Sequence, residues 1–208
     1  MSQRMGNLTL DTLDNLPLQC RSCVFWELST ECGSSETSYF GQALDKEAWL
    51  SATLLDWGSC GRIAYVDERP AGYVTYAKSK YVPRCNEFPS GPPSADAAVL
   101  MTVNVEPEYG KSGLGRLLVQ AAAADLSRRG IRAIEAYGDS RGEPGACMAP
   151  AEFFRTVGFK TIAAHPHYPR LRLDLHTLPE WETGVASLQN EIDAWLHAMA
   201  IAGASRAG

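Results

Sequence analysis

The sequence has no apolar run near the roughly 18 residues that a membrane-spanning helix requires. Its longest apolar stretches are short, as at residues 97–101 and 198–202. The first 14 residues also lack a cationic start followed by an apolar block, so no secretory signal peptide is expected. These absences predict a soluble protein without a membrane partner, located in the cytoplasm.

An excess of basic residues is also missing. The 208 residues contain 19 Lys and Arg against 24 Asp and Glu, a formal net charge of −5. General nucleic-acid binding needs a cationic face, so no nucleic-acid partner is expected. Apolar residues make up 45% of the chain, which is enough to build one good-sized core and argues against disorder.

The six cysteines do not form an obvious disulfide framework or metal site. In a cytoplasmic protein they are expected to be mostly thiols. Cys20 and Cys23 form a C-x-x-C pair, but zinc would need two more ligands, and Cys32 and Cys60 are isolated. A thioredoxin-type pair should open a helix after a strand, a setting that is not evident here. Buried thiols with aromatic neighbours are the simpler interpretation, and no bound metal is expected.

Apolar periodicity predicts alternating strands and helices in a single main domain. Residues 97–105 have the continuous apolar character of a central strand, and residues 83–93 hold four prolines and form a loop. Residues 20–28 are compatible with either a strand or a turn. Further strands are predicted at residues 8–13, 62–66, 71–77, 131–137, 159–163 and 170–175, and helices at 45–57, 114–129, 151–156 and 181–201.

The predicted domain spans residues 1–178 and includes a segment rich in cysteine and aromatic residues at 16–32. Residues 179–208 are expected to form a C-terminal helix and tail. One stripe of that helix is apolar, so it either packs on the domain or forms the contact of a homodimer.

Three glycines lie within six residues between a predicted strand and a predicted helix, at Gly110, Gly113 and Gly115. Glycine lets backbone N–H groups approach a ligand closely, and the N–H groups at a helix start favour phosphate oxygens. Lys111 and Arg116 add positive charge. The run is neither a P-loop nor a Gly-x-Gly-x-x-Gly fingerprint. A tight turn that uses glycine for packing alone is the alternative.

Two segments resemble a known family. Residues 103–109 (VNVEPEY), followed by residues 113–119 (GLGRLLV), resemble the cofactor-binding core of the GCN5-related N-acetyltransferases (GNAT). Residues 153–159 (FFRTVGF) resemble the second hallmark of that family, a short helix that ends in Gly-Phe. The resemblance implies an α/β (α+β) fold, a GNAT-like mixed β-sheet that is splayed at its centre and flanked by helices, here with an extra C-terminal helix.

The resemblance also implies an acyl-CoA-dependent N-acyltransferase, with acetyl-CoA as the expected co-substrate. The acceptor would be an amine of a small molecule or a protein, and it would attack the thioester directly while a backbone N–H polarises the carbonyl. The implied acyl-CoA contacts are Val103, Asn104, Val105, Gly110, Lys111, Ser112, Gly113, Leu114, Gly115, Arg116, Cys147 and Phe154. The implied acceptor contacts are Phe25, Trp26, Glu27 and Tyr81.

The sequence departs from the pattern of the family at three places. Gly110 stands where the family's turn usually begins with Arg or Gln. Cys147 and Pro150 stand at the start of the short helix, where Asn and Ala are frequent. Phe154 stands where a tyrosine usually protonates the departing thiolate, and a phenyl ring cannot donate a proton.

Other residues must therefore be considered for the proton transfers. Tyr137, Ser140 and Cys147 are candidate acids, and a reaction without a dedicated acid is the alternative, because a CoA thiolate is a tolerable leaving group. Glu135, which shares a strand face with Tyr137, is the candidate base, as are Glu106 and Glu108. The missing tyrosine also raises a second hypothesis, a non-catalytic acyl-CoA-binding sensor or regulatory module.

Overall fold

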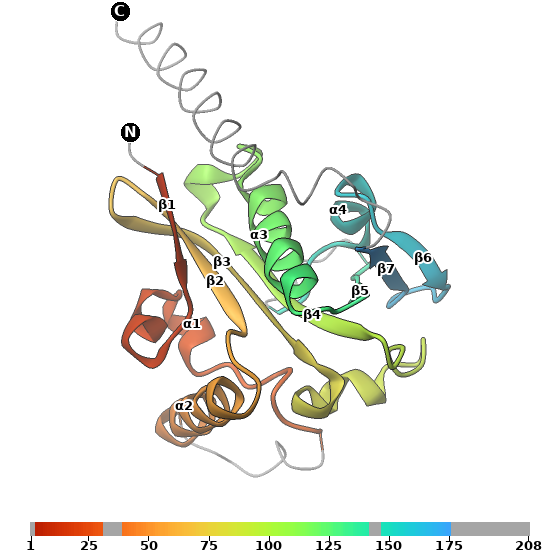
Figure 1. The fold of residues 1–208 in the computed structure, drawn as a ribbon, viewed down its shortest axis with the longest axis horizontal. Coiled ribbons are helices and arrows are strands. Elements are labelled where there is room, and N and C mark those ends of the chain that lie inside the picture. The colour runs from red at the N-terminus through yellow and green to blue at the C-terminus, as the bar shows by residue number, and fades with distance from the viewer. Residues whose placement is uncertain (1–2, 31–38, 142–146, 176–208) are drawn as a thin grey trace, which may run out of the picture.

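The computed structural model of the protein describes residues 3–30, 39–141 and 147–175. Within these residues, seven strands form one sheet in the order β1-β2-β3-β4-β5-β7-β6 (Figure 1). Neighbouring strands are antiparallel except for β4 and β5, which are parallel. The strands are β1 (Gln3–Asn7), β2 (Gly61–Val66), β3 (Arg69–Lys78), β4 (Ala97–Val105), β5 (Ala133–Tyr137), β6 (Lys160–Ala163) and β7 (Arg170–Asp174).

Helices cover both faces of the sheet. The described helices are α1 (Leu18–Arg21), α2 (Tyr39–Asp56), α3 (Leu114–Arg128) and α4 (Ala151–Thr156). Helix α3 lies across β2, β3 and β4, whereas α1 and α2 lie together at the other face (Figure 1). None of the described helices is both long and apolar enough to cross a membrane.

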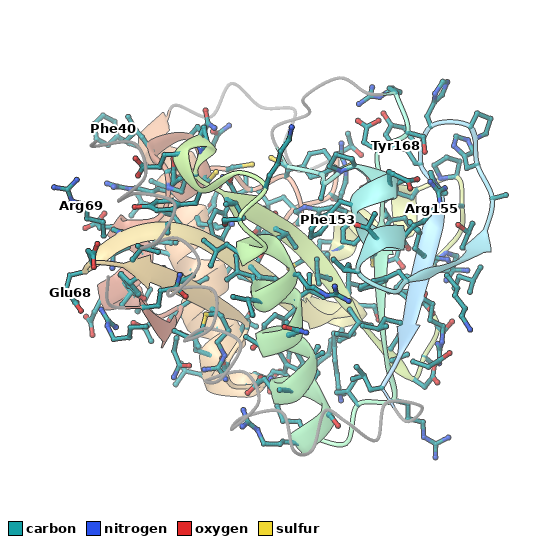
Figure 2. All side chains as sticks on the ribbon, turned by 90° about the horizontal axis from the view of Figure 1, so that it is seen from above. Phe40, Glu68, Arg69, Phe153, Arg155 and Tyr168 are labelled. Atoms are coloured by element: carbon teal, nitrogen blue, oxygen red, sulfur yellow. The ribbon has the colours of Figure 1, made fainter. Side chains whose placement is uncertain are left out.

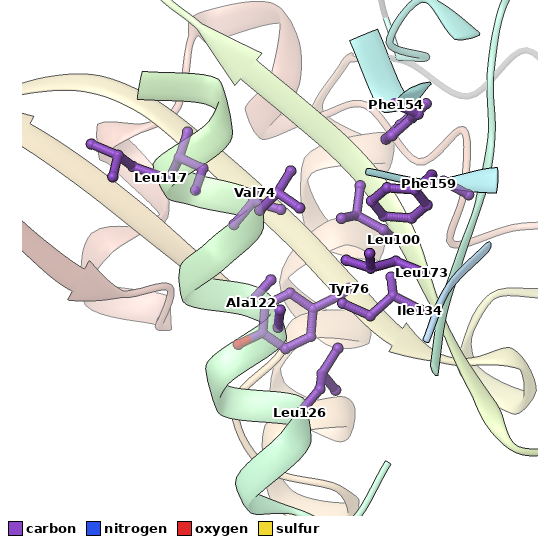
Figure 3. Packing of buried hydrophobic residues seen from close by; sticks show 14 of the residues in the cluster. Val74, Tyr76, Leu100, Leu117, Ala122, Leu126, Ile134, Phe154, Phe159 and Leu173 are labelled. Atoms are coloured by element: carbon purple, nitrogen blue, oxygen red, sulfur yellow. The ribbon is translucent and has the colours of Figure 1, made fainter. Parts of the chain in front are cut away.

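The alternation of side chains along the strands divides the core between the two faces. Leu117, Ala122 and Leu126 of α3 pack toward Val74 and Tyr76 of β3 (Figure 3). The same cluster continues to α4 and the last strands through Leu100, Ile134, Phe154, Phe159 and Leu173. On the opposite face, Leu50 of α2 packs with Ile63, Tyr65 and Tyr73.

The sheet opens between its two parallel strands. The pairing of β4 with β5 extends only from Ala97 to Leu100, whereas β4 stays paired with β3 as far as Val105. A register shift between the pairs at Leu100 and Thr102 marks a bulge in β4, and a bulge bends the strand that carries it. The centrally splayed, mixed sheet implied by the family resemblance is therefore confirmed.

Most predicted elements are confirmed, and the errors lie near the N-terminus. β4 and α4 have the predicted bounds, but residues 8–13 are not a strand. The first strand is Gln3–Asn7, and a 3-10 helix follows at Leu10–Asn15 because Thr12 bonds back to Asn7 and Thr9. Helix α2 begins at Tyr39 rather than at residue 45. The predicted C-terminal helix and the domain boundary after residue 178 lie outside the described residues.

Candidate functional site

The open half of β4 leads directly to the glycine-rich turn. A 3-10 turn at Pro107–Tyr109 follows the strand, and α3 begins at Leu114. The strand end also contacts the helix start, because a Cβ placed on Gly115 would lie 3.7 Å from a methyl group of Val105. The structure thus brings the predicted segments 103–105 and 110–116 together at one end of the opening.

The turn has a backbone conformation that favours glycine. Gly113 has φ +89° and forms the N-cap of α3, and Lys111 also lies in the left-handed region with φ +62°. Nothing lies within 4 Å of a Cβ placed on Gly113, so the space over the helix start is open. The first N–H groups of a helix have no partner within it and carry a partial positive charge. Lys111 and Arg116 are exposed, and neither forms an ion pair within the described part of the chain.

Gly115 has a different role from Gly113. A Cβ on Gly115 would lie 3.1 Å from the ring of Phe153, which extends from α4 on the side of the molecule that also carries β6 (Figure 2). The ligand-binding interpretation therefore suits Gly113, and the packing interpretation suits Gly115. Gly113 keeps the helix start open, and Gly115 lets α3 and α4 pack closely.

The protein contains a cavity of about 630 Å³. Cys147 lines it, and the Cys147 carbonyl accepts hydrogen bonds from Trp26 Nε1 at 3.0 Å and from Thr102 Oγ1 at 3.5 Å. Thr102 belongs to the open half of β4, so the cavity wall touches the opening in the sheet. The other lining residues are Phe25, Thr30, Arg84, Glu87, Phe88, Pro89, Asp139, Arg141, Met148 and Tyr168.

Two arginines of the cavity are held between a carboxylate and an aromatic ring. Arg84 lies 4.6 Å from the ring centre of Phe25 and 3.5 Å from Glu87, and Arg141 lies 5.0 Å from the ring centre of Tyr168. Arg141 also pairs with Asp139 at 2.7 Å, which lowers the pKa of that carboxyl group. The cavity therefore combines apolar surface with fixed charges of both signs, a combination typical of a binding site for a small polar molecule.

Two cysteines meet at this wall from distant parts of the chain. The Sγ atoms of Cys23 and Cys147 lie 2.9 Å apart although 124 positions separate them. The hydrogen bond from Cys147 lowers the pKa of Cys23 to about 6 despite its burial, and the Lys46 ammonium group acts in the same direction. The hydrogen bond to Cys23, together with burial, raises the pKa of Cys147. The pKa values of the two thiols therefore shift in opposite directions, which favours the thiolate form on Cys23.

This asymmetry predicts an unusual pH profile for alkylation. The rate of reaction of Cys23 with iodoacetamide should rise through about pH 6 and level off above it, because the thiolate is the nucleophile. An ordinary thiol would titrate near ~8.5. Mass-spectrometric alkylation rates measure the profile, and Cys147→Ala should shift its midpoint upward. A wild-type midpoint above ~8 would contradict the assignment.

Two predicted proton-transfer residues are held in structural contacts. Tyr137 is 1% exposed, and its hydroxyl lies 2.9 Å from the carbonyl oxygens of both Cys85 and Gly91, to which it donates. Its ring stacks on Phe88 with 4.4 Å between the ring centres, and burial raises its pKa. The Tyr137 hydroxyl is therefore bound to the proline-rich loop, and its role as the acid stays a prediction.

Glu135 is fully buried beside two arginines. Its carboxylate accepts hydrogen bonds from Arg170 at 2.9 Å, from Arg172 at 3.1 Å and from the Ser94 N–H at 3.1 Å. The exposed fraction of its side chain is 0%, and Glu135 is not among the residues that line the cavity. The structure places Glu135 in an ion pair between β5 and β7, and its role as the base stays a prediction.

The structure places the four predicted acceptor contacts in different environments. Phe25 lines the cavity. Trp26 is buried, and Glu27 is buried in an ion pair with Lys46, so their contact with an acceptor stays a prediction. Tyr81 is also not among the residues that line the cavity, and its hydroxyl donates to Asp56.

The comparison with protein families agrees with this architecture. The family model described as the acetyltransferase (GNAT) family matches residues 24–159. The chain belongs to the GNAT family. No curated protein sequence matches the chain.

Solved structures of other proteins show the same fold. The chain is similar to the PaiA N-acetyltransferase from Thermoplasma acidophilum in complex with coenzyme A, with a TM-score of 0.56 and 17% identity over 84% of this chain and 99% of that one. It is also similar to an N-acetyltransferase from Staphylococcus aureus Mu50, with a TM-score of 0.55 and 13% identity over 84% and 99%. Ard1 from Thermoplasma volcanium has a TM-score of 0.51 and 12% identity over 84% and 98%. At sequence identities this low, the similarity shows a shared fold and nothing beyond it.

Phe154, at the position of the usual GNAT tyrosine, lies in the main core. It is 1% exposed and packs on Phe153 and Phe159, with ring centres 5.5 and 5.3 Å away. Phe154 therefore contributes to the core of this GNAT protein rather than to the cavity wall. Ser140 is exposed, and Cys147 is the one candidate acid that lines the cavity among the residues described.

Sequence patterns did not indicate several residues of this GNAT site. Cys23 appeared structural because its partner is far along the chain, and Thr102 lies in the middle of a strand that looks wholly structural. Arg84, Asp139 and Tyr168 come from three separate connections. The length of the proline-rich loop was the one feature that pointed toward Arg84, since long loops are often functional.

No group of three or more His, Cys, Asp or Glu residues that would suit a metal is found in the described ranges.

Proposed function

We propose that this GNAT protein transfers an acetyl group from acetyl-CoA to a small-molecule amine bound in the cavity. The observation that carries the proposal is the contact between Cys147, on the cavity wall, and Thr102, on the open half of β4. An acceptor in the cavity and a thioester along β4 would meet at this contact. A cavity of about 630 Å³ is within the usual size range of small-molecule sites, which supports a small acceptor over a protein.

The opening in the sheet offers two kinds of contact to acetyl-CoA. The backbone of β4 beyond Leu100 lacks a pairing strand on the β5 side within the described residues, so its polar groups are available to the pantetheine arm. The start of α3 can bind the pyrophosphate through backbone N–H groups, and Lys111 and Arg116 add positive charge. These cations would supply the charge that Gly110 does not.

The chemistry requires little from the protein beyond positioning and polarisation. The neutral amine attacks the thioester carbonyl carbon, and a backbone N–H of β4 stabilises the negative oxygen of the tetrahedral intermediate. The C–S bond then breaks, and the CoA thiolate leaves. Cys147 is the candidate donor to that thiolate, because it is the candidate acid that lines the cavity. Solvent can take the proton of the amine.

Release of free CoA thiol in the presence of different amines tests the proposal. The panel contains amino acids, polyamines, aminoglycosides and peptides with free N-termini, and acetyl-CoA without an amine is the control. We expect amine-dependent thiol release with at least one small amine, and initial rates that give intersecting reciprocal plots, as direct attack within a ternary complex requires. Absence of turnover with every amine at high protein concentration would contradict catalysis.

A non-catalytic acyl-CoA-binding module is the second candidate, and the buried Phe154 favours it. This hypothesis predicts that acetyl-CoA raises the thermal midpoint of unfolding while no amine is acetylated. Phe154→Tyr would then produce no activity. The thiol-release panel and the thermal measurement together separate the two functions.

A further inference from the structure

We propose that Cys23 and Cys147 form a redox-active dithiol, which a hydroperoxide oxidises to a disulfide. The proposal concerns a modification site at the cavity wall and does not need acetyl transfer to be correct. Only its expected effect on turnover rests on the proposed function.

The geometry of the two cysteines is the primary observation. Their Sγ atoms lie 2.9 Å apart, so a disulfide needs a movement of less than about 1 Å, given a bond of ~2.05 Å. Cys23 follows α1, and Cys147 lies in the connection before α4. Both are half-buried, and Cys147 lines the cavity, so a small oxidant can reach the pair.

The surroundings make Cys23 the reactive member. The Lys46 ammonium group, only 7% exposed, donates to the Cys23 carbonyl oxygen at 3.0 Å and pairs with Glu27. Lys46 and the Cys147 thiol favour the thiolate form of Cys23, whereas Glu27 and burial oppose it. By contrast, burial raises the pKa of both Cys60 and Cys85 to about 12, which keeps these thiols unreactive.

The oxidation proceeds in two balanced steps. The Cys23 thiolate attacks one oxygen of the hydroperoxide, the O–O bond breaks, and the leaving alkoxide or hydroxide takes up a proton, which leaves a sulfenic acid on Cys23. The Cys147 sulfur then loses its proton and attacks the Cys23 sulfur. The S–O bond breaks and water leaves, so two thiols become one disulfide while the peroxide is reduced to an alcohol, or to water. A dithiol reductant reverses the change by exchange.

The disulfide would alter the proposed acetyl-transfer site. It would join the segment after α1 to the connection before α4 at the point where Cys147 contacts Thr102. It would also remove the thiol proton of Cys147, the candidate donor to the CoA thiolate. The oxidised protein should therefore acetylate an amine at least about 10-fold more slowly. General acid catalysis typically contributes ~10²–10⁴-fold, and the expected effect is smaller here because the CoA thiolate is a good leaving group.

Peptide mapping after oxidation tests the proposal on the full chain. The reduced protein is treated with one equivalent of hydrogen peroxide, free thiols are blocked, and disulfide-linked peptides are identified by mass spectrometry. We expect a cross-link between Cys23 and Cys147 that dithiothreitol reverses. Cys20→Ser is the matched control, because it removes the other half of the C-x-x-C pair and should leave this cross-link intact.

A cross-link between Cys20 and Cys23, or loss of the cross-link in Cys20→Ser, would overturn the proposal. Oxidation of Cys23 without any cross-link to Cys147 would overturn it as well. The wild-type map needs no variant, so a folding defect in Cys23→Ser or Cys147→Ser cannot obscure the result. Thiol release by the fully reduced protein is measured separately, so that failure of acetyl transfer and failure of the dithiol are distinguished.

Discussion

Glu135→Ala is expected to lower the free energy of unfolding by about 3–5 kcal/mol, the usual cost of removing one partner from a buried ion pair. Glu135 is completely buried, and its two oxygens accept from Arg170 and Arg172, which are only 15% and 18% exposed. Its removal leaves Arg170 and the Ser94 N–H without this acceptor, whereas Arg172 keeps Asp96 and Asp174. Denaturant-induced unfolding of the wild type and the variant measures the loss, provided that the unfolding free energy has the same slope against denaturant concentration in both proteins.

The same variant distinguishes a structural role from a catalytic one. Glu135→Gln keeps the shape of the side chain and one acceptor oxygen, so its loss of stability should be smaller than that of Glu135→Ala. If Glu135→Ala were as stable as wild type while acetyl transfer disappeared, the glutamate would be the base that the sequence predicted. The ion pair between β5 and β7 would then contribute little to the fold.

Gly113→Val is expected to weaken acetyl-CoA binding by about 100-fold, which corresponds to ~2.7 kcal/mol. Gly113 has φ +89°, a conformation that a β-branched residue adopts only with strain. The turn must therefore change its path, and the N–H groups at the start of α3 then no longer point together toward a pyrophosphate. The added methyl groups would also occupy the open space above the helix start. Isothermal calorimetry with acetyl-CoA measures the change.

The other end of the same helix supplies a matched control. Gly130 follows α3 and has φ +72°, and nothing lies within 4 Å of a Cβ placed on it. Gly130→Val therefore introduces comparable backbone strain far from the proposed pyrophosphate site. Its acetyl-CoA affinity should stay within about 2-fold of wild type. Equal losses of affinity in both variants would mean that Gly113 acts through general stability rather than through the ligand.

Local sequence patterns predicted the elements that carry strong local preferences. A continuous apolar run, with a proline-rich loop before it and Glu-Pro after it, marked β4. Pro150 and Gly158 marked the limits of α4, because proline suits the first turn of a helix and glycine its end. The first strand was misplaced because Gln3–Asn7 has little apolar character. Its strand conformation depends on pairing with β2 rather than on its own residues.

The site was less predictable because its groups meet through tertiary contacts. Alternation correctly placed Glu135 and Tyr137 on one face of β5, but it could not show that Arg170 and Arg172 lie opposite them on β7. The pairing of Cys23 with Cys147 depends on the path of the chain across the whole domain. The glycine turn, whose backbone conformation is set locally, could be recognised from neighbouring residues, and the family resemblance indicated Phe25 and Cys147 of the cavity wall.

The most direct test of the central claim is calorimetric titration of the reduced protein with acetyl-CoA. The opening between β4 and β5, with the cationic start of α3 at its end, predicts one binding site per chain. The affinity should fall as salt is added, since screening weakens the attraction of Lys111 and Arg116 for the phosphates. Saturable one-to-one binding that Gly113→Val weakens and Gly130→Val preserves is the predicted result. Absence of binding at millimolar acetyl-CoA would contradict the assignment of this opening as an acyl-CoA site.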